Sequence, residues 1–119
     1  MNLAIWDIES SSASTDFGSI IEIGGVLVDE NFKEKDRFNL RCRLPEGEIF
    51  QAMALIVNKT SIKKLTQANL SHYQMLAEVE KIFKKWSPAI FLGWSNIGFD
   101  DEMIRKEFFK GIRYPYLTN

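Results

Sequence analysis

The chain has 119 residues, of which 45% are hydrophobic and 26% are charged, the composition of one ordinary globular domain. Fifteen Lys and Arg residues against sixteen Asp and Glu residues give a net charge of -1, which excludes binding of nucleic acid through a uniform positive field. A single cysteine and a single histidine exclude an internal disulfide framework and a metal site built from Cys or His clusters. Any contact with nucleic acid must therefore come from a local site.

Targeting signals are not evident, and we expect a cytoplasmic protein with no membrane partner. The first residues, Met1–Asp7, lack the basic segment of a signal peptide and reach a carboxylate early. No apolar run in the sequence approaches the length needed to span a bilayer.

The first part of the chain predicts three strands. Asn2–Ile8 is a short apolar run that ends in charge, and Ile20–Asp29 is rich in β-branched residues. Gly24-Gly25 in the second run indicates either a bulge or a close approach of neighbouring groups. After a turn, Arg37–Leu44 alternates polar and apolar residues with a period of two. Because the connections are short, we expect an antiparallel meander.

The second part of the chain predicts helices around a fourth strand. Thr60–Leu70 is compatible with a short helix, and Ser71–Trp86 carries an apolar stripe at helical spacing. The stripe consists of Met75, Val79, Ile82, Phe83 and Trp86. Ala89–Gly93 is a short apolar strand typical of the middle of a sheet, and Phe99–Lys110 is another helix. The predicted order is βββαβα, and the predicted fold class is α/β with a mixed sheet.

Two carboxylates mark the end of the first strand. Asp7 and Glu9 are two residues apart, so strand alternation places both side chains on one face. Neighbouring carboxylates repel, and burying them is costly unless they share a cation. Mg²⁺ suits such a pair because it binds carboxylate oxygens and keeps positions for a substrate phosphate. Such a pair alone is more often a strand end that simply reaches solvent.

A second acidic site follows the fourth strand. Asp100 begins the last predicted helix and is followed by Asp101 and Glu102. If a right-handed crossover places Ala89–Gly93 parallel to the first strand, both acidic sites lie at the carboxyl ends of neighbouring strands, where α/β sheets bind ligands. Asp100 could instead serve only the helix dipole, but three consecutive acids exceed that need.

These motifs resemble those of the DEDD-type 3′–5′ exonucleases. The resemblance rests on residues 6–11 (WDIESS), 20–26 (IIEIGGV) and 93–102 (GWSNIGFDDE), with Tyr114-Pro115-Tyr116 further on. Asp-x-Glu is weak evidence alone, whereas the second motif is specific. Its Asn-x-x-Phe-Asp-Asp-Glu form is most similar to the bacterial exonuclease I branch, which acts on single-stranded DNA. The resemblance covers the whole chain.

The resemblance implies a ribonuclease H-like mixed sheet and two-metal hydrolysis of phosphodiester bonds with Mg²⁺ or Mn²⁺. It implies that Asp7 bridges both ions, that Glu9 holds the ion that activates the attacking water, and that Asp100 holds the other. The implied partner is single-stranded nucleic acid, with DNA favoured. Six further residues are implied at the substrate, namely Ile8, Asn96, Phe99, Leu55, Asn58 and Lys59. Phe99 and Asn96 are also compatible with a core aromatic residue and a turn residue.

The family also has a third motif, which supplies a fourth carboxylate and a His or Tyr general base, and the sequence ends at Asn119 without it. We therefore expect residues 1–119 to be the N-terminal portion of a single exonuclease domain, lacking the last strand and helix of the family fold. We expect it to be incomplete or weakly active by itself, because activation of the water is much of the catalysis. Ala89–Gly93 would then be an exposed apolar edge able to pair with another copy in a homo-oligomer.

Other functions remain compatible with the sequence. A nucleic-acid-binding module that does not cleave predicts metal-dependent binding without products. A structural or interaction domain predicts no effect of Mg²⁺ or Mn²⁺ on the melting temperature, because only a ligand of the native state stabilises it. Among exonucleases, an oligoribonuclease or a proofreading enzyme is the alternative to the single-strand DNA enzyme.

Overall fold

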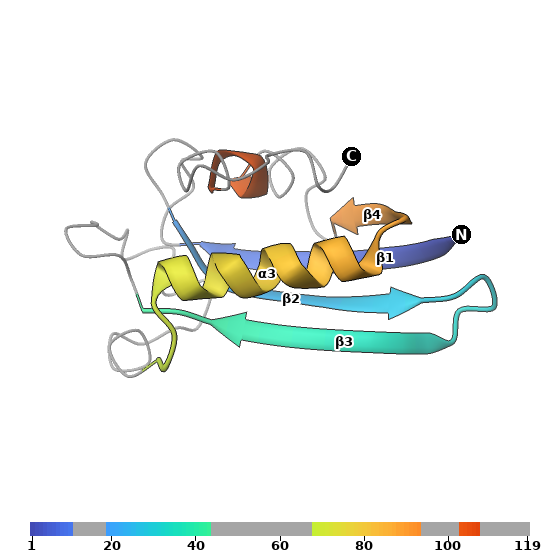
Figure 1. Cartoon of the computed structure of the whole chain (residues 1–119), viewed down its shortest axis with the longest axis horizontal. Coiled ribbons are helices and arrows are strands. Elements are labelled where there is room, and N and C mark those ends of the chain that lie inside the picture. The colour runs from blue at the N-terminus through green and yellow to red at the C-terminus, as the bar shows by residue number, and fades with distance from the viewer. Residues whose placement is uncertain (11–18, 44–67, 94–102, 108–119) are drawn as a thin grey trace.

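A four-stranded mixed sheet covered on one face by a long helix forms the body of the molecule (Figure 1). The computed structural model describes residues 1–10, 19–43, 68–93 and 103–107. The elements are β1 (Asn2–Ser10), β2 (Ile20–Val28), β3 (Glu34–Arg41), α3 (His72–Trp86) and β4 (Ala89–Gly93), and residues 103–107 are also helical. No helix among these residues is long and apolar enough to cross a membrane.

The sheet has the order β3-β2-β1-β4. β1, β2 and β3 form the predicted antiparallel meander, and β4 runs parallel to β1 as the crossover argument requires. These pairings confirm the α/β fold class and its mixed sheet. β4 lies at the edge of the described sheet, where Ile90 and Leu92 are exposed. The interpretation of this strand as a mid-sheet strand is therefore wrong for the described strands, and its pairing with another copy stays a prediction.

β3 begins and ends three residues earlier than the alternation predicts. Its first residues, Glu34–Asp36, are polar and carry no apolar signal, which an edge strand with one paired neighbour tolerates. After Arg41, at the other end of β3, the chain pairs with a different segment. Cys42 forms a parallel bridge with Leu70, and the Arg43 N–H donates to the Leu70 carbonyl at 2.9 Å.

The long helix begins where the sequence places it. Ser71 is its N-cap: the Ser71 hydroxyl accepts from the Gln74 N–H at 3.1 Å, and the Gln74 side chain accepts from the Ser71 N–H at 2.9 Å. The buried face consists of Met75, Leu76, Val79, Phe83 and Trp86, so the predicted stripe omits Leu76 and includes Ile82, which is half-buried. Of the shorter helix predicted over Thr60–Leu70, residues 68–70 are not helical, and the others lie outside the described residues.

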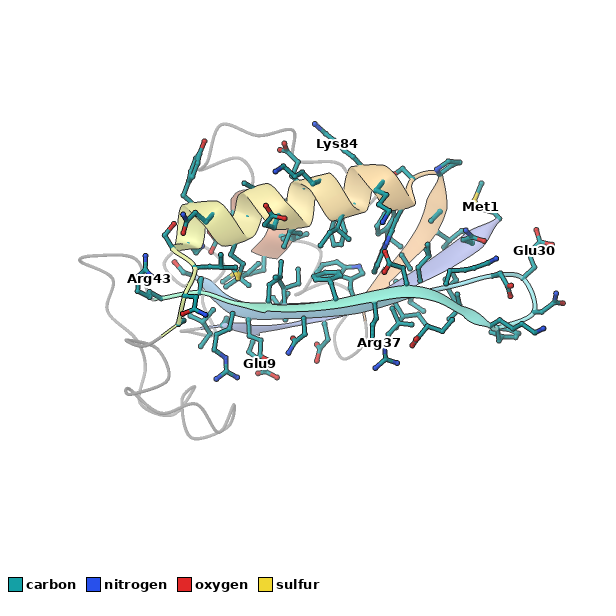
Figure 2. The ribbon with its side chains drawn as sticks, turned by 60° about the horizontal axis from the view of Figure 1, so that its bottom comes forward. Met1, Glu9, Glu30, Arg37, Arg43 and Lys84 are labelled. Atoms are coloured by element: carbon teal, nitrogen blue, oxygen red, sulfur yellow. The ribbon has the colours of Figure 1, made fainter. Side chains whose placement is uncertain are left out.

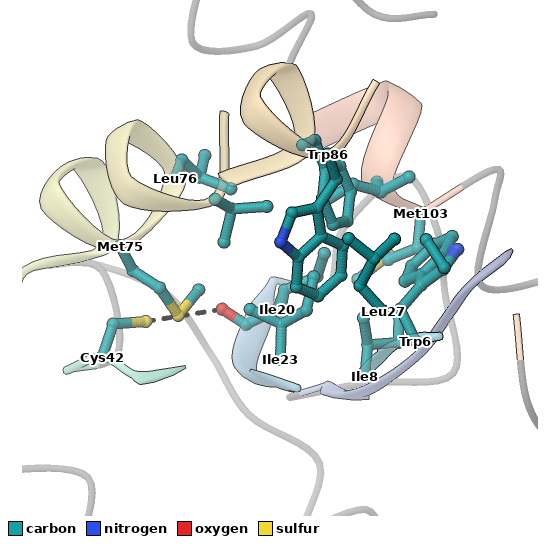
Figure 3. Packing of buried hydrophobic residues seen from close by; sticks show 14 residues of the cluster. Trp6, Ile8, Ile20, Ile23, Leu27, Cys42, Met75, Leu76, Trp86 and Met103 are labelled. Carbon is teal, nitrogen blue, oxygen red and sulfur yellow. Dashed lines mark hydrogen bonds between the residues drawn. The ribbon is translucent and has the colours of Figure 1, made fainter. Parts of the chain in front are cut away.

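The core between α3 and the sheet is mostly aliphatic and contains an aromatic cluster around Phe83 (Figure 3). The Phe83 ring contacts Trp6 of β1, Phe38 of β3 and Phe91 of β4, with ring centroids 5.9, 6.2 and 5.1 Å away. Trp86 joins the cluster and satisfies its polar group, because its indole N–H donates to Asp36 Oδ2 at 2.9 Å. Through these ring contacts, α3 fixes the positions of β1, β3 and β4.

A buried carboxylate closes the far end of the core. Glu107, of the helical residues 103–107, is 1% exposed, and its Oε1 accepts from the Ile20 N–H at 3.0 Å. Its Oε2 lies 3.1 Å from Nε2 of His72. The single histidine thus faces a buried acid at the start of α3. These contacts tie the start of β2 to two helices.

Candidate functional site

The two predicted acids of β1 lie on the sheet face opposite α3. Ala4, Trp6 and Ile8 alternate along β1 and are buried toward the helix, whereas Asp7 and Glu9 are half-buried on the other face. Figure 2 shows Glu9 projecting from the sheet on the side away from α3. The prediction that Asp7 and Glu9 share a face is therefore confirmed.

Strand register places two rows of residues across this face, which no described element covers and which we call the open face. Asp7 pairs with Gly24, which pairs with Asn39, and Glu9 pairs with Glu22, which pairs with Arg41. The rows surround a hollow of about 180 Å³. Its lining residues are Asp7, Ile8, Glu9, Glu22, Gly24 and Asn39. Because the Ile8 side chain is buried in the core, Ile8 can contribute its main chain to the hollow, as the resemblance implies.

The two glycines of β2 make room on opposite faces of the sheet. A Cβ at Gly24 would lie 3.1 Å from Oδ1 of Asn39, so the glycine keeps space beside Asp7. A Cβ at Gly25 would lie 2.9 Å from a ring carbon of Phe38, so this glycine admits the aromatic core. The pair is thus a close approach rather than a bulge, and the register shifts of β2 occur at its two ends.

Glu22 is a third acid at the site, and the sequence analysis assigns it no role. Its Oε2 forms an ion pair with Nη2 of Arg41 at 2.7 Å, and its Oε1 accepts from Nδ2 of Asn39 at 3.2 Å. Both partners come from β3. The available signal is that Glu22 is the one charged residue in the apolar run of β2. Its carboxylate is held toward β3 by this cation and amide.

Burial raises the pKa of Glu9 above its usual value of 4.5, and the negative charges of Asp7 and Glu22 raise it further. Among the described residues, the site therefore concentrates negative charge around Glu9. Carboxylate oxygens at this spacing are the donors that Mg²⁺ and Mn²⁺ prefer. The donor chemistry and the space above Gly24 both fit a divalent cation, which Asp7 and Glu9 could hold.

Removal of the Glu9 charge is expected to stabilise the metal-free protein. A raised carboxyl pKa means that ionisation costs more in the folded than in the unfolded chain, so this penalty grows as the pH rises above 4.5 and is absent well below it. Glu9→Gln should therefore raise the melting temperature in EDTA at neutral pH, and the gain should shrink on acidification. Glu78→Gln, on the outer face of α3, is the control and should change little. A neutral-pH melting temperature equal to or below wild type would contradict the prediction.

The other predicted site residues are not placed by the structure. Asp100, Asn96, Phe99, Leu55, Asn58 and Lys59 lie outside the described residues. Within residues 1–10, 19–43, 68–93 and 103–107, no three His, Cys, Asp or Glu side chains form a metal-binding group. Cys42 contributes nothing to such chemistry, because burial, with the Glu107 charge, raises the pKa of its thiol to about 12.

The antiparallel three-strand meander, the covering helix and the fourth strand parallel to the first form a ribonuclease H-like mixed α/β fold. Solved structures of exonuclease I have this fold. The zinc-bound Escherichia coli enzyme with single-stranded DNA matches 99% of this chain and 25% of its own, with a TM-score of 0.89 and 18% identity. The same enzyme with a dT13 oligonucleotide matches 97% of this chain and 25% of its own, with a TM-score of 0.87 and 18% identity.

A moderately thermophilic exonuclease I from Methylocaldum szegediense is equally similar. It matches 99% of this chain and 25% of its own, with a TM-score of 0.88 and 18% identity. The chain thus spans about a quarter of the length of these proteins and has the fold of the exonuclease I N-terminal domain. No protein-family model matches the sequence, and no curated protein matches it significantly.

Proposed function

We propose that this chain is part of a DEDD-type exonuclease domain that removes nucleotides from the 3′ end of single-stranded DNA with the help of Mg²⁺ or Mn²⁺. The observation that carries the proposal is the Asp7 and Glu9 pair, which lies on the open face of an exonuclease I fold beside a hollow kept clear by Gly24. The E. coli enzyme of that fold has been solved with single-stranded DNA and in a zinc-bound form, which supports both the substrate and the use of a divalent metal.

The residues of the chain take distinct roles in this proposal. Asp7 and Glu9 hold the metal ions on the open face, and Asp100 completes the set from the segment after β4. Bound divalent ions supply positive charge to the scissile phosphate and lower the pKa of a coordinated water. Glu22 stays with Arg41 and Asn39, which leaves the hollow beside Asp7 for substrate. The remaining implied contacts to the terminal nucleotides are Ile8, through its main chain, with Asn96, Phe99, Leu55, Asn58 and Lys59.

Degradation of end-labelled oligonucleotides tests the proposal. The chain is incubated with 3′- and 5′-labelled single-stranded DNA in Mg²⁺ and in Mn²⁺, beside an Asp7→Asn variant that keeps the size of the side chain. We expect slow stepwise shortening from the 3′ end by the wild-type chain, in keeping with the weak activity expected of residues 1–119, and none above background in the variant. The same assay on RNA of equal sequence separates the single-strand DNA enzyme from an oligoribonuclease.

The outcomes separate the candidate functions. Equal products from both proteins would mean that Asp7 is not a metal-holding residue and would contradict the proposal. Metal-dependent binding of the oligonucleotide without any product would identify a nucleic-acid-binding module instead. A result with neither binding nor cleavage would agree with an incomplete exonuclease domain that is inactive by itself.

A further inference from the structure

The open face of β3 carries a polar stripe, and the proposed function assigns its residues no contact with the substrate. Arg37, Asn39 and Arg41 alternate along the strand, while the intervening residues face α3: Asp36 accepts from the Trp86 indole, and Phe38 packs on Phe83. Figure 2 shows Arg37 and Glu9 projecting from the same side of the sheet, opposite α3. We call Arg37, Asn39 and Arg41 the β3 stripe.

The register brings the β3 stripe alongside the acidic pair. Arg41 is the β3 residue in the row of paired residues that begins with Glu9 on β1. Asn39 has the same place in the row of Asp7, and Arg37 pairs with Val26 in the next row. Two strand spacings of about 4.8 Å separate β1 from β3, so the stripe lies about 10 Å from the carboxylates. Side chains on one face recur about every 6.8 Å along the strand, a step comparable with that between successive phosphates of an extended nucleic-acid strand. The stripe therefore has the position and spacing to hold a polyanion that enters the site.

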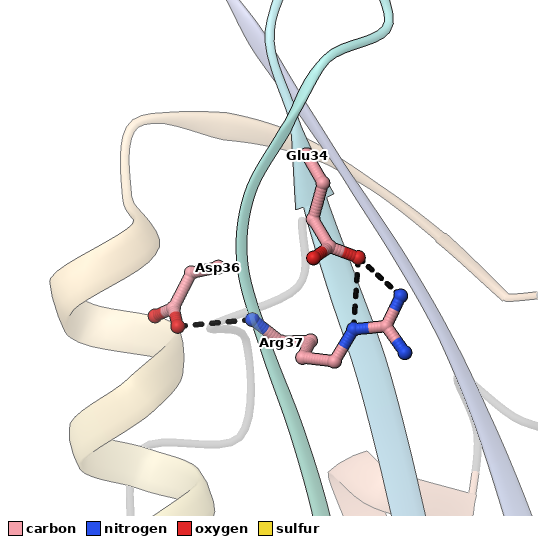
Figure 4. Close-up of polar contacts among 3 residues, drawn as sticks. All are labelled: Glu34, Asp36 and Arg37. Atoms are coloured by element: carbon pink, nitrogen blue, oxygen red, sulfur yellow. Dashed lines mark hydrogen bonds and ion pairs between the residues drawn. The ribbon is translucent and has the colours of Figure 1, made fainter.

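Both arginines of the stripe are oriented by carboxylates. Figure 4 shows Glu34 accepting from Arg37: the Nε bond is 2.8 Å long, and Nη2 donates to the same oxygen. Arg41 is held by Glu22 through Nη2. A guanidinium has five N–H donors, so these contacts use only part of each fork and fix its direction. Arg37 remains 69% exposed at its side chain, and an exposed ion pair of this kind contributes little to stability.

Charge complementarity indicates the occupant. The net charge of the chain is -1, and the hollow itself carries Asp7, Glu9 and Glu22, so a phosphodiester strand is repelled unless cations lie beside it. Arginine binds phosphate oxygens through paired N–H donors. We propose that the β3 stripe binds the phosphate backbone of a single-stranded nucleic acid whose reacting end lies at Asp7 and Glu9. This inference rests on the proposed function and adds the path of the strand.

Lys81 offers a closely matched control for Arg37. Each is an exposed cation paired with a glutamate three residues before it, Glu78 for Lys81 and Glu34 for Arg37, and their side chains are 74% and 69% exposed. Lys81, however, lies on α3, on the other side of the sheet from the acids. Arg37→Gln and Lys81→Gln therefore make the same change in charge at sites that differ in their relation to the hollow.

The test is the affinity for fluorescein-labelled dT13 and for its RNA counterpart, measured by fluorescence anisotropy in EDTA over a series of salt concentrations. We expect Arg37→Gln to weaken binding about three- to tenfold at low salt and to reduce the slope of log K against log salt by about 0.7. Lys81→Gln should stay within about twofold of wild type. Because phosphate contacts do not read the sugar, the loss should be equal for DNA and RNA. Melting temperatures check that both variants are folded.

The outcomes separate this inference from the proposed function. If the wild-type chain shortens DNA from the 3′ end and Arg37→Gln binds the oligonucleotide as tightly as Lys81→Gln does, the β3 stripe does not bind the phosphate backbone. That result contradicts this inference and leaves the proposed function intact. If the chain neither cleaves nor binds, this inference falls. If Arg37→Gln alone weakens binding while no cleavage occurs, the result supports phosphate binding by the β3 stripe but not the exonuclease function.

Discussion

Mg²⁺ or Mn²⁺ is expected to raise the melting temperature of the wild-type chain and to leave Asp7→Asn and Glu9→Gln nearly unchanged. Burial, with the negative charges of Asp7 and Glu22, raises the pKa of Glu9, so the ionised Glu9 carboxylate is disfavoured in the folded state. A bound cation relieves this repulsion in the folded state only. At a metal concentration about a hundred times its Kd, the native state gains about 2.7 kcal/mol, which corresponds to a rise of about 10 °C for a domain of this size.

Sodium chloride at matched ionic strength is the control for this experiment. Screening of exposed charges by salt should move all three proteins alike and by little. A wild-type response equal to that of the two variants would place the bound metal away from β1. No response in any of them would favour the interaction domain, in which the acids hold no ion.

Local patterns in the sequence predict the elements that position the site. The two-residue alternation of β1 is enough to place Asp7 and Glu9 on one face, because every strand obeys it. The apolar spacing likewise predicts α3 almost to the residue, and the structure adds Ser71 as its N-cap. The parallel pairing of β4 with β1 follows from the handedness of crossovers, which is a rule of topology and needs no detail of side chains.

The parts of the site that the sequence does not predict depend on contacts between distant residues. Glu22 gains its place in the site from Arg41 and Asn39, 19 and 17 residues away, and nothing in the local pattern of β2 indicates these partners. The first residues of β3 have no apolar period because an edge strand needs none. Glu107 accepts a hydrogen bond from the Ile20 main chain, 87 residues away, so a pattern over a few neighbouring residues cannot predict its burial.

Phe83→Ala is expected to lower the free energy of unfolding by about 3–5 kcal/mol, the usual cost of removing a fully buried aromatic side chain. Phe83 is 0% exposed, and its ring contacts Trp6, Phe38 and Phe91, so its removal leaves a cavity where three strands meet α3. The matched control is Tyr73→Ala in the same helix, because that ring is 67% exposed and the change in helix propensity is similar.

Chemical denaturation with urea measures both variants, and a similar loss in the two would contradict the central place given to Phe83. The consequence extends to the site, because Trp6 precedes Asp7 in β1 and rests on the Phe83 ring at 5.9 Å between centroids. A looser contact there lets β1 shift relative to β2, and the spacing of the carboxylates is set by that pairing. Phe83→Ala should therefore also reduce the stabilisation by Mg²⁺ at a temperature where the variant is still folded, whereas Tyr73→Ala should keep it. The aromatic cluster on one face of the sheet and the acidic pair on the other thus both depend on the position of β1.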